Sequence, residues 1–372
     1  DRAGVNSNLS VANAGDDAHP DYVLKAPVEG EPGWAVHGLL DYGNIGNRYV
    51  GKDIVDGGMT VTAPFGGQLN LTAVSNIPGS VPGSLYREFA GSLSQVTPYG
   101  IFGVDGRYVM LHREFVGLHL REKIRQAGIS WLFPIYVDFK RQMTFRAHAT
   151  RNSLATRLTE LPGIDVKSEL YTALSLAFNY AQYLGAERHW QIQSGLGIEH
   201  GFGPHHTKLT FAQLDYWLFR PSITLKYAAD APWRVTLAMR GQLTSDTLPE
   251  TKEWVLGGLN QLSAYHAGIL VGDVGGVGTL RLAYANQPLW FATLTPAVFV
   301  EYGYSSQRRG IGNSPRLHGQ QLADAGGSLK IALGNHLAAR VSIADGFYDH
   351  NLDPRIRHAH RAIYMFRVTA SF

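Results

Sequence analysis

The chain has 372 residues, and its 33 lysines and arginines against 30 aspartates and glutamates give a formal net charge of +3. A balance this close excludes nucleic-acid binding through a strongly basic surface. The absence of cysteine excludes thiol catalysis, cysteine-ligated zinc and disulfides. A hydrophobic content of 45% excludes a disordered chain. No apolar run reaches the length of a membrane-spanning helix, so we expect none.

The first 33 residues precede any regular pattern of apolar and polar residues. The chain starts at Asp1 without the basic region or the apolar core of a signal peptide. We therefore interpret Asp1 as a processed or trimmed end, which leaves an extracytoplasmic location open.

From Trp34 onward, apolar and polar residues alternate with a period of two, as they do in strands with one apolar face. Over 142–150, for example, Met143 and Phe145 alternate with Thr144 and Arg146. A soluble β-sandwich would show the same alternation, but sixteen segments of this length favour an all-β, 16-stranded antiparallel transmembrane barrel. The predicted strands are 34–43, 56–64, 67–76, 88–98, 101–112, 125–136, 140–151, 166–183, 188–200, 209–228, 232–245, 276–286, 290–305, 323–333, 336–346 and 361–372.

A long glycine-containing loop separates the eleventh and twelfth predicted strands. Single pairs such as Gly257-Gly258 are also common in ordinary hairpin turns, so only the ordered set is specific. The loop motif consists of Leu256, Gly257, Gly258, Leu262, Ser263, Ala264, Tyr265, Gly272 and Asp273.

The last predicted strand alternates strictly and ends on an aromatic residue. Its apolar face resembles the signal by which bacterial outer-membrane barrels are recognised for insertion, and it comprises Tyr364, Phe366, Val368 and Phe372. This resemblance implies a bacterial outer-membrane location, with outer-membrane lipid and the barrel assembly machinery as partners.

The loop resembles that of the two-partner secretion transporters (TpsB type), which export haemolysins and filamentous adhesins and belong to the outer-membrane assembly and translocation superfamily. In that family, a strand ending in Gly-Gln leads through Leu-Pro to Leu-Gly-Gly, then to a hydrophobic-Arg-Gly-Tyr tetrad, and then to Gly-Asp. Residues 241–273 keep this order and spacing. The stretch Asp41-Tyr42-Gly43-Asn44, followed by Gly46, Arg48 and Gly51, also resembles the family. The resemblance implies passive export of an unfolded, secreted polypeptide partner, with no enzyme activity and no cofactor.

One departure concerns the tetrad, whose arginine is Ser263 and whose glycine is Ala264 in this chain. In the family, the arginine lies on a loop folded into the lumen and pairs with an acidic residue of the inner wall. Either Tyr265, Gln261 and Asp273 hold the loop through neutral hydrogen bonds, or the loop is more mobile. We expect the loop to fold inward with Leu262 and Tyr265 in the lumen, and we take Glu301 as the acidic candidate on the wall.

The resemblance also implies a domain organisation. Family members carry periplasmic POTRA modules before the barrel, and Asp21–Glu29 looks like the last strand of such a module. We therefore expect residues 1–33 to be the tail of a POTRA-like module with its linker, residues 34–372 to be the barrel, and the N-terminus to be periplasmic. A truncated chain is favoured over a reduced variant of the family.

Polar residues on the inward faces of the predicted strands would line the lumen. Each of them also fits ordinary wall lining, and a diffusion pore or a structural anchor that no longer secretes is the competing function. A plugged transporter should show a modest, flickering conductance, whereas an emptied pore should conduct steadily. The candidate wall residues are Arg146, Arg234, Arg240, Gln242, Arg281, Glu301, Lys330, Arg340 and Arg367.

Histidines and acids near strand ends are the candidates for catalysis or metal binding. Adjacent histidines on a strand point to opposite faces, which is a poor metal geometry, and we expect solvated loop histidines with no catalytic and no metal site. These clusters are Glu199-His200 with His205-His206, and Asp349-His350 with Asp353, His358 and His360.

Overall fold

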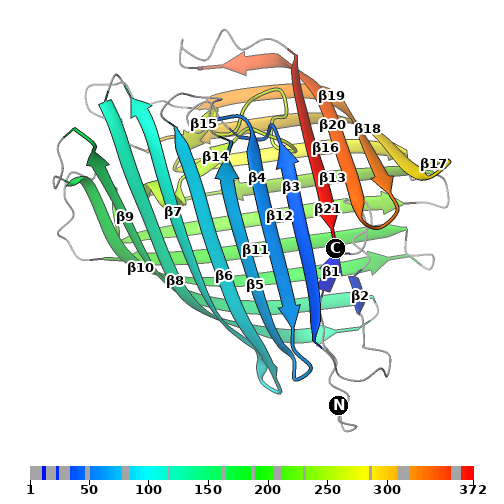
Figure 1. Cartoon of the computed structure of the whole chain (residues 1–372), viewed down its shortest axis with the longest axis horizontal. Coiled ribbons are helices and arrows are strands. Elements are labelled where there is room, and N and C mark those ends of the chain that lie inside the picture. Colours follow the sequence, from blue (N-terminus) through cyan, green and yellow to red (C-terminus); the bar gives the residue numbers. More distant parts are fainter. Residues whose placement is uncertain are drawn as a thin grey trace.

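The computed structural model describes residues 11–13, 22–24, 34–46, 51–77, 84–115, 118–138, 140–160, 165–185, 189–203, 212–228, 232–284, 287–308, 319–352 and 362–372. Sixteen long antiparallel strands close into one barrel, and Figure 1 shows them strongly tilted around the lumen. This confirms the predicted fold class. The only helical element among the described residues is the 3-10 turn η1 (Glu250–Lys252).

The barrel strands follow one another in chain order around the wall. They are β3 (Ala35–Gly43), β4 (Ile54–Thr62), β5 (Gly67–Asn76), β6 (Leu85–Thr97), β7 (Gly100–Phe115), β8 (Leu118–Val137), β9 (Arg141–Leu158), β10 (Asp165–Leu184), β11 (Trp190–Phe202), β12 (Tyr216–Ala228), β13 (Trp233–Gln242), β16 (Val274–Tyr284), β18 (Ala292–Ser306), β19 (Gln320–Leu333), β20 (Leu337–His350) and β21 (Ile363–Ser371). Short elements complete the described chain. They are β1 (Val11–Asn13) paired with β2 (Tyr22–Leu24), β14 (Trp254–Leu256) paired with β15 (Leu270–Gly272), and β17 (Gln287–Leu289) paired with the start of β18.

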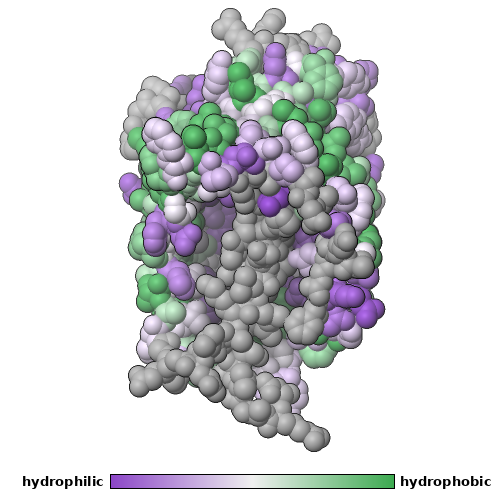
Figure 2. All heavy atoms as spheres, turned by 90° about the vertical axis from the view of Figure 1, so that its right-hand side faces the viewer, coloured by the Kyte–Doolittle hydropathy of each residue, from purple (hydrophilic) through white to green (hydrophobic). Residues whose placement is uncertain are grey.

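The alternation of the sequence becomes the two faces of the wall. On the outer face, the Phe145 ring lies 6.1 Å from that of Trp131 and 5.0 Å from that of Phe178, so apolar side chains of three neighbouring strands pack together. On the inner face, His148 Nε2 lies 2.8 Å from Asp105 Oδ1. Hydrophobic residues lie along both flanks of the molecule in Figure 2. An apolar outside and a polar lumen are what a barrel in lipid requires.

The first and last strands close the barrel. β21 pairs antiparallel with β3 from Arg367↔Gly43 to Ser371↔Leu39. Inside this seam, Asp41 accepts hydrogen bonds from the Arg367 guanidinium and from the Thr369 hydroxyl. The first and last strands of the sheet are thereby paired with each other, which removes the two exposed edges that an open sheet would present.

Thirteen of the sixteen predicted strands agree with the observed ones to within about four residues at each end. β8 begins at Leu118 rather than at 125, and β9 ends at Leu158 rather than at 151, because these two strands stay paired as far as Leu120↔Leu158. The strand expected over 209–228 begins at Tyr216, because the N–H of Gln213 donates to the carbonyl oxygen of Thr247 instead of to β11. Among the described residues, no helix has the length and apolarity that crossing a membrane would require.

Candidate functional site

The loop between β13 and β16, residues 243–273, folds back into the barrel. Its two arms pair as the hairpin β14–β15, with Leu256 opposite Leu270. Gly257 and Gly258 follow at φ of 107° and 95°, values that L-residues with a side chain rarely adopt, and this lets the chain turn immediately after β14. The segment 259–268, which we call the loop tip, lies beyond this turn (Figure 1).

The apolar residues of the loop pack against the inner wall. Leu256, Leu262 and Leu270 are fully buried and Tyr265 nearly so. Their partners belong to β16, β18, β19 and β20, and they are Val277, Phe299, Leu322 and Ala344. Burying such side chains stabilises the inward position by about 1.5–3 kcal/mol each relative to exposure, before the entropic cost of ordering the loop.

Wall glycines provide the room for this packing. A Cβ atom built on Gly303 would lie 2.6 Å from Leu262 Cδ1, and one on Gly346 would lie 2.1 Å from the Tyr265 hydroxyl oxygen. With Leu262 and Tyr265 in place, a larger residue at either position would push the loop away from the wall. The absence of side chains at these two strand positions therefore helps to determine where the loop tip sits.

Two buried acids of the wall receive the loop backbone. Glu301 on β18 and Asp324 on β19 lie directly opposite each other in the sheet, and both are buried. The N–H of Ser263 donates to Glu301 Oε2 at 2.6 Å, and the N–H of Ala264 donates to Asp324 Oδ2 at 2.7 Å. Backbone amides of the loop thus bind the wall acids, one of which is the predicted candidate Glu301.

The side chains of Ser263 and Tyr265 stabilise the loop tip without contacting the wall acids. Ser263 Oγ accepts the N–H of Asn260 at 3.1 Å, which shapes the tip from within. The Tyr265 hydroxyl is buried without a hydrogen-bond partner in the described part of the chain, so this side chain acts through its packing. The backbone oxygen of Gln261 accepts the N–H of Gly257 at 2.9 Å.

Gln242 and Asp273 hold the neck of the loop, where it leaves β13 and enters β16. Gln242 Nε2 donates to the backbone oxygens of Lys252 and Asp273, each at 3.0 Å. The Asp273 carboxylate accepts the N–H of Leu248 at 2.7 Å and that of Arg308 at 2.6 Å. Gln242 and Asp273 therefore connect the two ends of the loop with each other and with the end of β18 at Arg308.

The part of the loop that precedes β14, residues 243–253, is held by ion pairs that the sequence analysis did not predict. We call this segment the outer arm. Glu250 pairs with Lys167 of β10 at 2.8 Å, and Lys252 pairs with the buried carboxylate of Glu199 on β11 at 2.8 Å. Burial and the nearby carboxylate of Glu250 raise the pKa of Glu253 to about 8. Three of the four residues at 250–253 are charged, and they lie between Leu248-Pro249 and Trp254–Leu256, which is the signal that could have drawn attention to them.

The remaining predicted wall residues do not form one cluster. Arg240, Lys330 and Arg340 border a cavity together with Arg281. Arg367 instead pairs with Asp41 at the closing seam. Arg234 lies six positions before Arg240 on β13, and Arg146 lies on β9. Asp324 was missed because an inward acid on an alternating strand looks like any other polar wall residue until the register places it opposite Glu301.

The aromatic face of the last strand points outward. Tyr364 and Phe372 are exposed, and the ring of Phe366 lies 5.4 Å from that of Tyr42 on β3. Val368 lies on the same face, opposite Tyr42 in the register.

The two predicted clusters of histidines and acids lie partly within and partly outside the described residues. His200 stacks on Trp217 at 4.4 Å, and the carboxylate of Glu199 is engaged by Lys252 and by the Tyr216 hydroxyl. Asp349 and His350 end β20. His205, His206, Asp353, His358 and His360 lie outside the described residues, as does Arg48. Within the described ranges, no three acids or histidines gather as metal ligands would.

Comparisons with known proteins agree with this architecture. Residues 123–325 match the sequence profile of a family described as haemolysin secretion/activation protein ShlB/FhaC/HecB. The chain is similar to CdiB from Escherichia coli, with a TM-score of 0.77 and 14% identity over 92% of this chain and 64% of that chain. For CdiB from Acinetobacter baumannii the TM-score is 0.70 and the identity 16%, over 91% of this chain and 60% of that chain.

A third solved structure shares the fold more distantly. BamA from Haemophilus ducreyi lacking POTRA domains 1–3 has a TM-score of 0.59 and 12% identity, over 91% of this chain and 70% of that chain. The chain spans less than two thirds of the length of either CdiB protein. No curated protein matches the sequence.

Proposed function

Because the chain belongs to the haemolysin secretion/activation protein family ShlB/FhaC/HecB, we propose that its barrel exports an unfolded polypeptide partner across the outer membrane. The family and the closed barrel indicate an outer-membrane protein, and the family is one of secretion proteins rather than enzymes. The observation that carries the proposal is a loop seated inside the lumen through two backbone hydrogen bonds to buried acids.

The seat of the loop suits a plug that has to move. Each contact between the tip and the acids is a single N–H···O bond, and the net contribution of a hydrogen bond to a charged group is about 1.5–3 kcal/mol. The burial of Leu262 and Tyr265 adds to these bonds, so an arriving polypeptide has to replace both kinds of contact with contacts of its own. No nucleotide is available at the outer membrane, so the folding of the partner outside would drive its net movement.

The proposed orientation places the N-terminus in the periplasm. In this orientation, the short turn 63–66 and the turn at Gly334 face the periplasm, and the loop 243–273 enters from the outer side. Residues 1–33 would be the tail of a POTRA-like module that receives the partner by strand addition. The short pair β1–β2 ahead of the barrel supports this assignment.

A reversible lock tests the export function. The chain has no cysteine, so Leu262→Cys together with Gly303→Cys creates a single disulfide candidate at a point where the wall already approaches the loop. The variant is produced with the secreted polypeptide encoded beside its gene, and the polypeptide in the medium is quantified. We expect export to stop under oxidising conditions and to return after reduction.

Two controls make the result interpretable. The Leu262→Cys single variant, which keeps the wall glycine, should export under both conditions, and the double variant should keep the heat-modifiable gel mobility of a folded barrel. Undiminished export by the oxidised double variant, with the disulfide verified, would contradict the proposal. A steady conductance without export by the wild-type barrel would favour the diffusion pore.

A further inference from the structure

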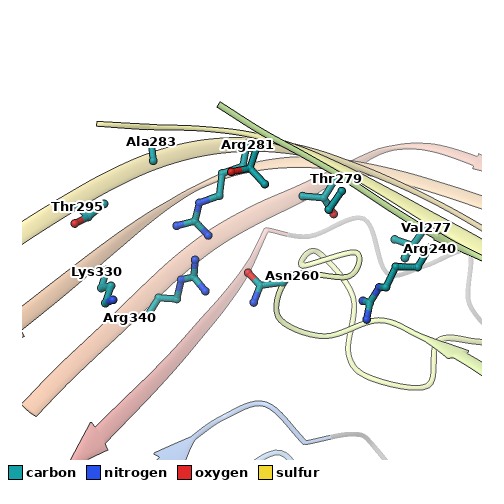
Figure 3. Close-up of a pocket in the computed structure, with 11 residues that line it drawn as sticks. Arg240, Asn260, Val277, Thr279, Arg281, Ala283, Thr295, Lys330 and Arg340 are labelled. Carbon is teal, nitrogen blue, oxygen red and sulfur yellow. The ribbon is translucent and has the colours of Figure 1, made fainter. Parts of the chain in front are cut away.

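A cationic cavity lies between the loop tip and the wall. It has a volume of about 260 Å³, and its charged lining comes from Arg240 on β13, Arg281 on β16, Lys330 on β19 and Arg340 on β20. In Figure 3, the guanidinium groups of Arg281 and Arg340 point toward one another, and Asn260 of the loop tip reaches toward the same space. Four strands and the loop thus direct polar groups into one volume.

The register of the sheet brings like charges together in this cavity. Lys330 and Arg340 are directly opposite each other on β19 and β20. Like charges in opposing positions destabilise a sheet, and an anion bound beside them would offset that cost. None of the eleven described residues that line the cavity is acidic. Glu301 acts electrostatically on Arg240 at one side of the cavity.

Neutral groups complete the lining. Arg281 Nη2 donates to Ser328 Oγ at 3.3 Å, which fixes the orientation of one guanidinium edge. Thr236, which is opposite Arg281 in the sheet register, supplies a hydroxyl group to the lining, whereas the Thr279 hydroxyl donates to Glu301 Oε1 at 3.4 Å. Arginine, lysine and hydroxyl side chains are the combination that proteins use for anionic oxygen groups, because guanidinium matches carboxylate and phosphate geometry with two parallel hydrogen bonds.

We propose that this cavity is a binding site for an anionic oxygen group, a carboxylate or a phosphate. Arg281 and Lys330 hold the group, and the Thr236 hydroxyl beside Arg281 completes its hydrogen bonds. Its ligand is either a free phosphate species or an acidic side chain of a polypeptide that reaches the lumen. The first source is independent of the proposed export function, whereas the second rests on it.

Binding to the detergent-solubilised full chain tests the site. Pyrophosphate and a short oligoglutamate peptide are titrated separately by calorimetry at low ionic strength. Lys330→Gln and Arg281→Gln each remove one charge from the cavity. The matched control is Arg146→Gln, which removes one inward charge from β9, a strand that is not adjacent to any of the strands lining the cavity. Heat-modifiable gel mobility verifies that each variant is folded.

We expect wild-type binding of at least one probe, weakened about tenfold or more by each cavity variant and unchanged by Arg146→Gln. Weakening for pyrophosphate alone assigns the site to free phosphate species. Weakening that includes oligoglutamate assigns it to carboxylates of a polypeptide. The proposal is overturned if the wild type binds neither probe, if the cavity variants bind as well as the wild type, or if Arg146→Gln weakens binding equally.

Discussion

The loop tip is held by backbone N–H groups, which every residue except proline possesses. The N–H groups of Ser263 and Ala264 donate to Glu301 and Asp324, so the loop is seated although residue 263 is serine rather than the arginine that the resemblance implies. The side chains that matter are on the wall. A buried carboxylate costs free energy unless hydrogen bonds satisfy it, so the acids and the loop amides depend on each other.

Replacing Asp324 therefore separates the hydrogen bond from the charge. Asp324→Leu leaves the N–H of Ala264 buried without its acceptor, which costs about 1–3 kcal/mol, whereas Asp324→Asn retains an acceptor oxygen. With Ser263→Cys as a buried reporter thiol, we expect Asp324→Leu to speed maleimide labelling about 5- to 100-fold and Asp324→Asn to change it much less. Equal labelling rates in the two variants would contradict the role of this hydrogen bond.

Glu253 gives the seated loop a pH dependence. Burial, with the charges of Glu250 and Asp273, raises the pKa of Glu253 to about 8 when the loop is seated, while an exposed glutamate titrates near 4.3. The seated loop is thus most stable at low pH, where Glu253 is protonated in both states. This stability is lost progressively as the pH rises toward about 8.

The measurement is labelling of a Leu248→Cys reporter, whose position in the same arm as Glu253 is buried, divided at each pH by labelling of an exposed Asn335→Cys thiol. We expect the ratio to rise about 100-fold or more from pH ~5 to pH ~8, because one pKa unit corresponds to about a tenfold change in the opening equilibrium, and to be flat in the Glu253→Gln background. A ratio that rises equally in that background would assign the pH dependence to another group.

At the scale of elements, the sequence predicts the strands far better than the loop. Alternation over nine or more residues locates each barrel strand, because one face meets lipid and the other meets polar groups along the whole span. The three-residue strands β14 and β15 are too short to show a period. The partners of η1 are Lys167 and Glu199, which precede it by more than 50 positions, and only the closed barrel brings them together.

The outer arm and the tip of the loop should open separately. Lys252→Gln removes the ion pair with Glu199, a carboxylate that keeps its hydrogen bond from Tyr216. We expect faster backbone hydrogen exchange over 246–254 and unchanged exchange over 262–265, because the tip is held by its own contacts with the acids and the wall glycines. Hydrogen-exchange mass spectrometry of the folded barrel resolves the two segments. Faster exchange of both to the same degree would show that the loop opens as one unit.

At the scale of the whole molecule, the lumen has two unlike sides. Acids on β3 and β6 are matched by cations, as Asp41 is by Arg367 and Glu88 by Arg107. The opposite side, from β13 to β20, directs four cationic side chains into one cavity. A cavity lined by one sign of charge concentrates ions of the other sign, so we expect it to draw anions into an emptied lumen against the field of Glu301 and Asp324 on the same side.

Deleting the loop tip tests this description of the whole barrel. Removing 259–268 joins Gly258 to Ile269, and the hairpin keeps its pairing because Leu256 already lies opposite Leu270. We expect a folded, heat-modifiable barrel whose single-channel conductance in planar bilayers is higher and steadier than that of the wild type, with anion selectivity that falls as salt screens the wall. The oxidised Leu262→Cys/Gly303→Cys variant is the control with the tip fixed inside, and it should stay at the low conductance. If the deletion leaves conductance unchanged, the tip is not what closes the lumen. If the opened pore prefers cations, the matched acids rather than the cationic cavity dominate its field.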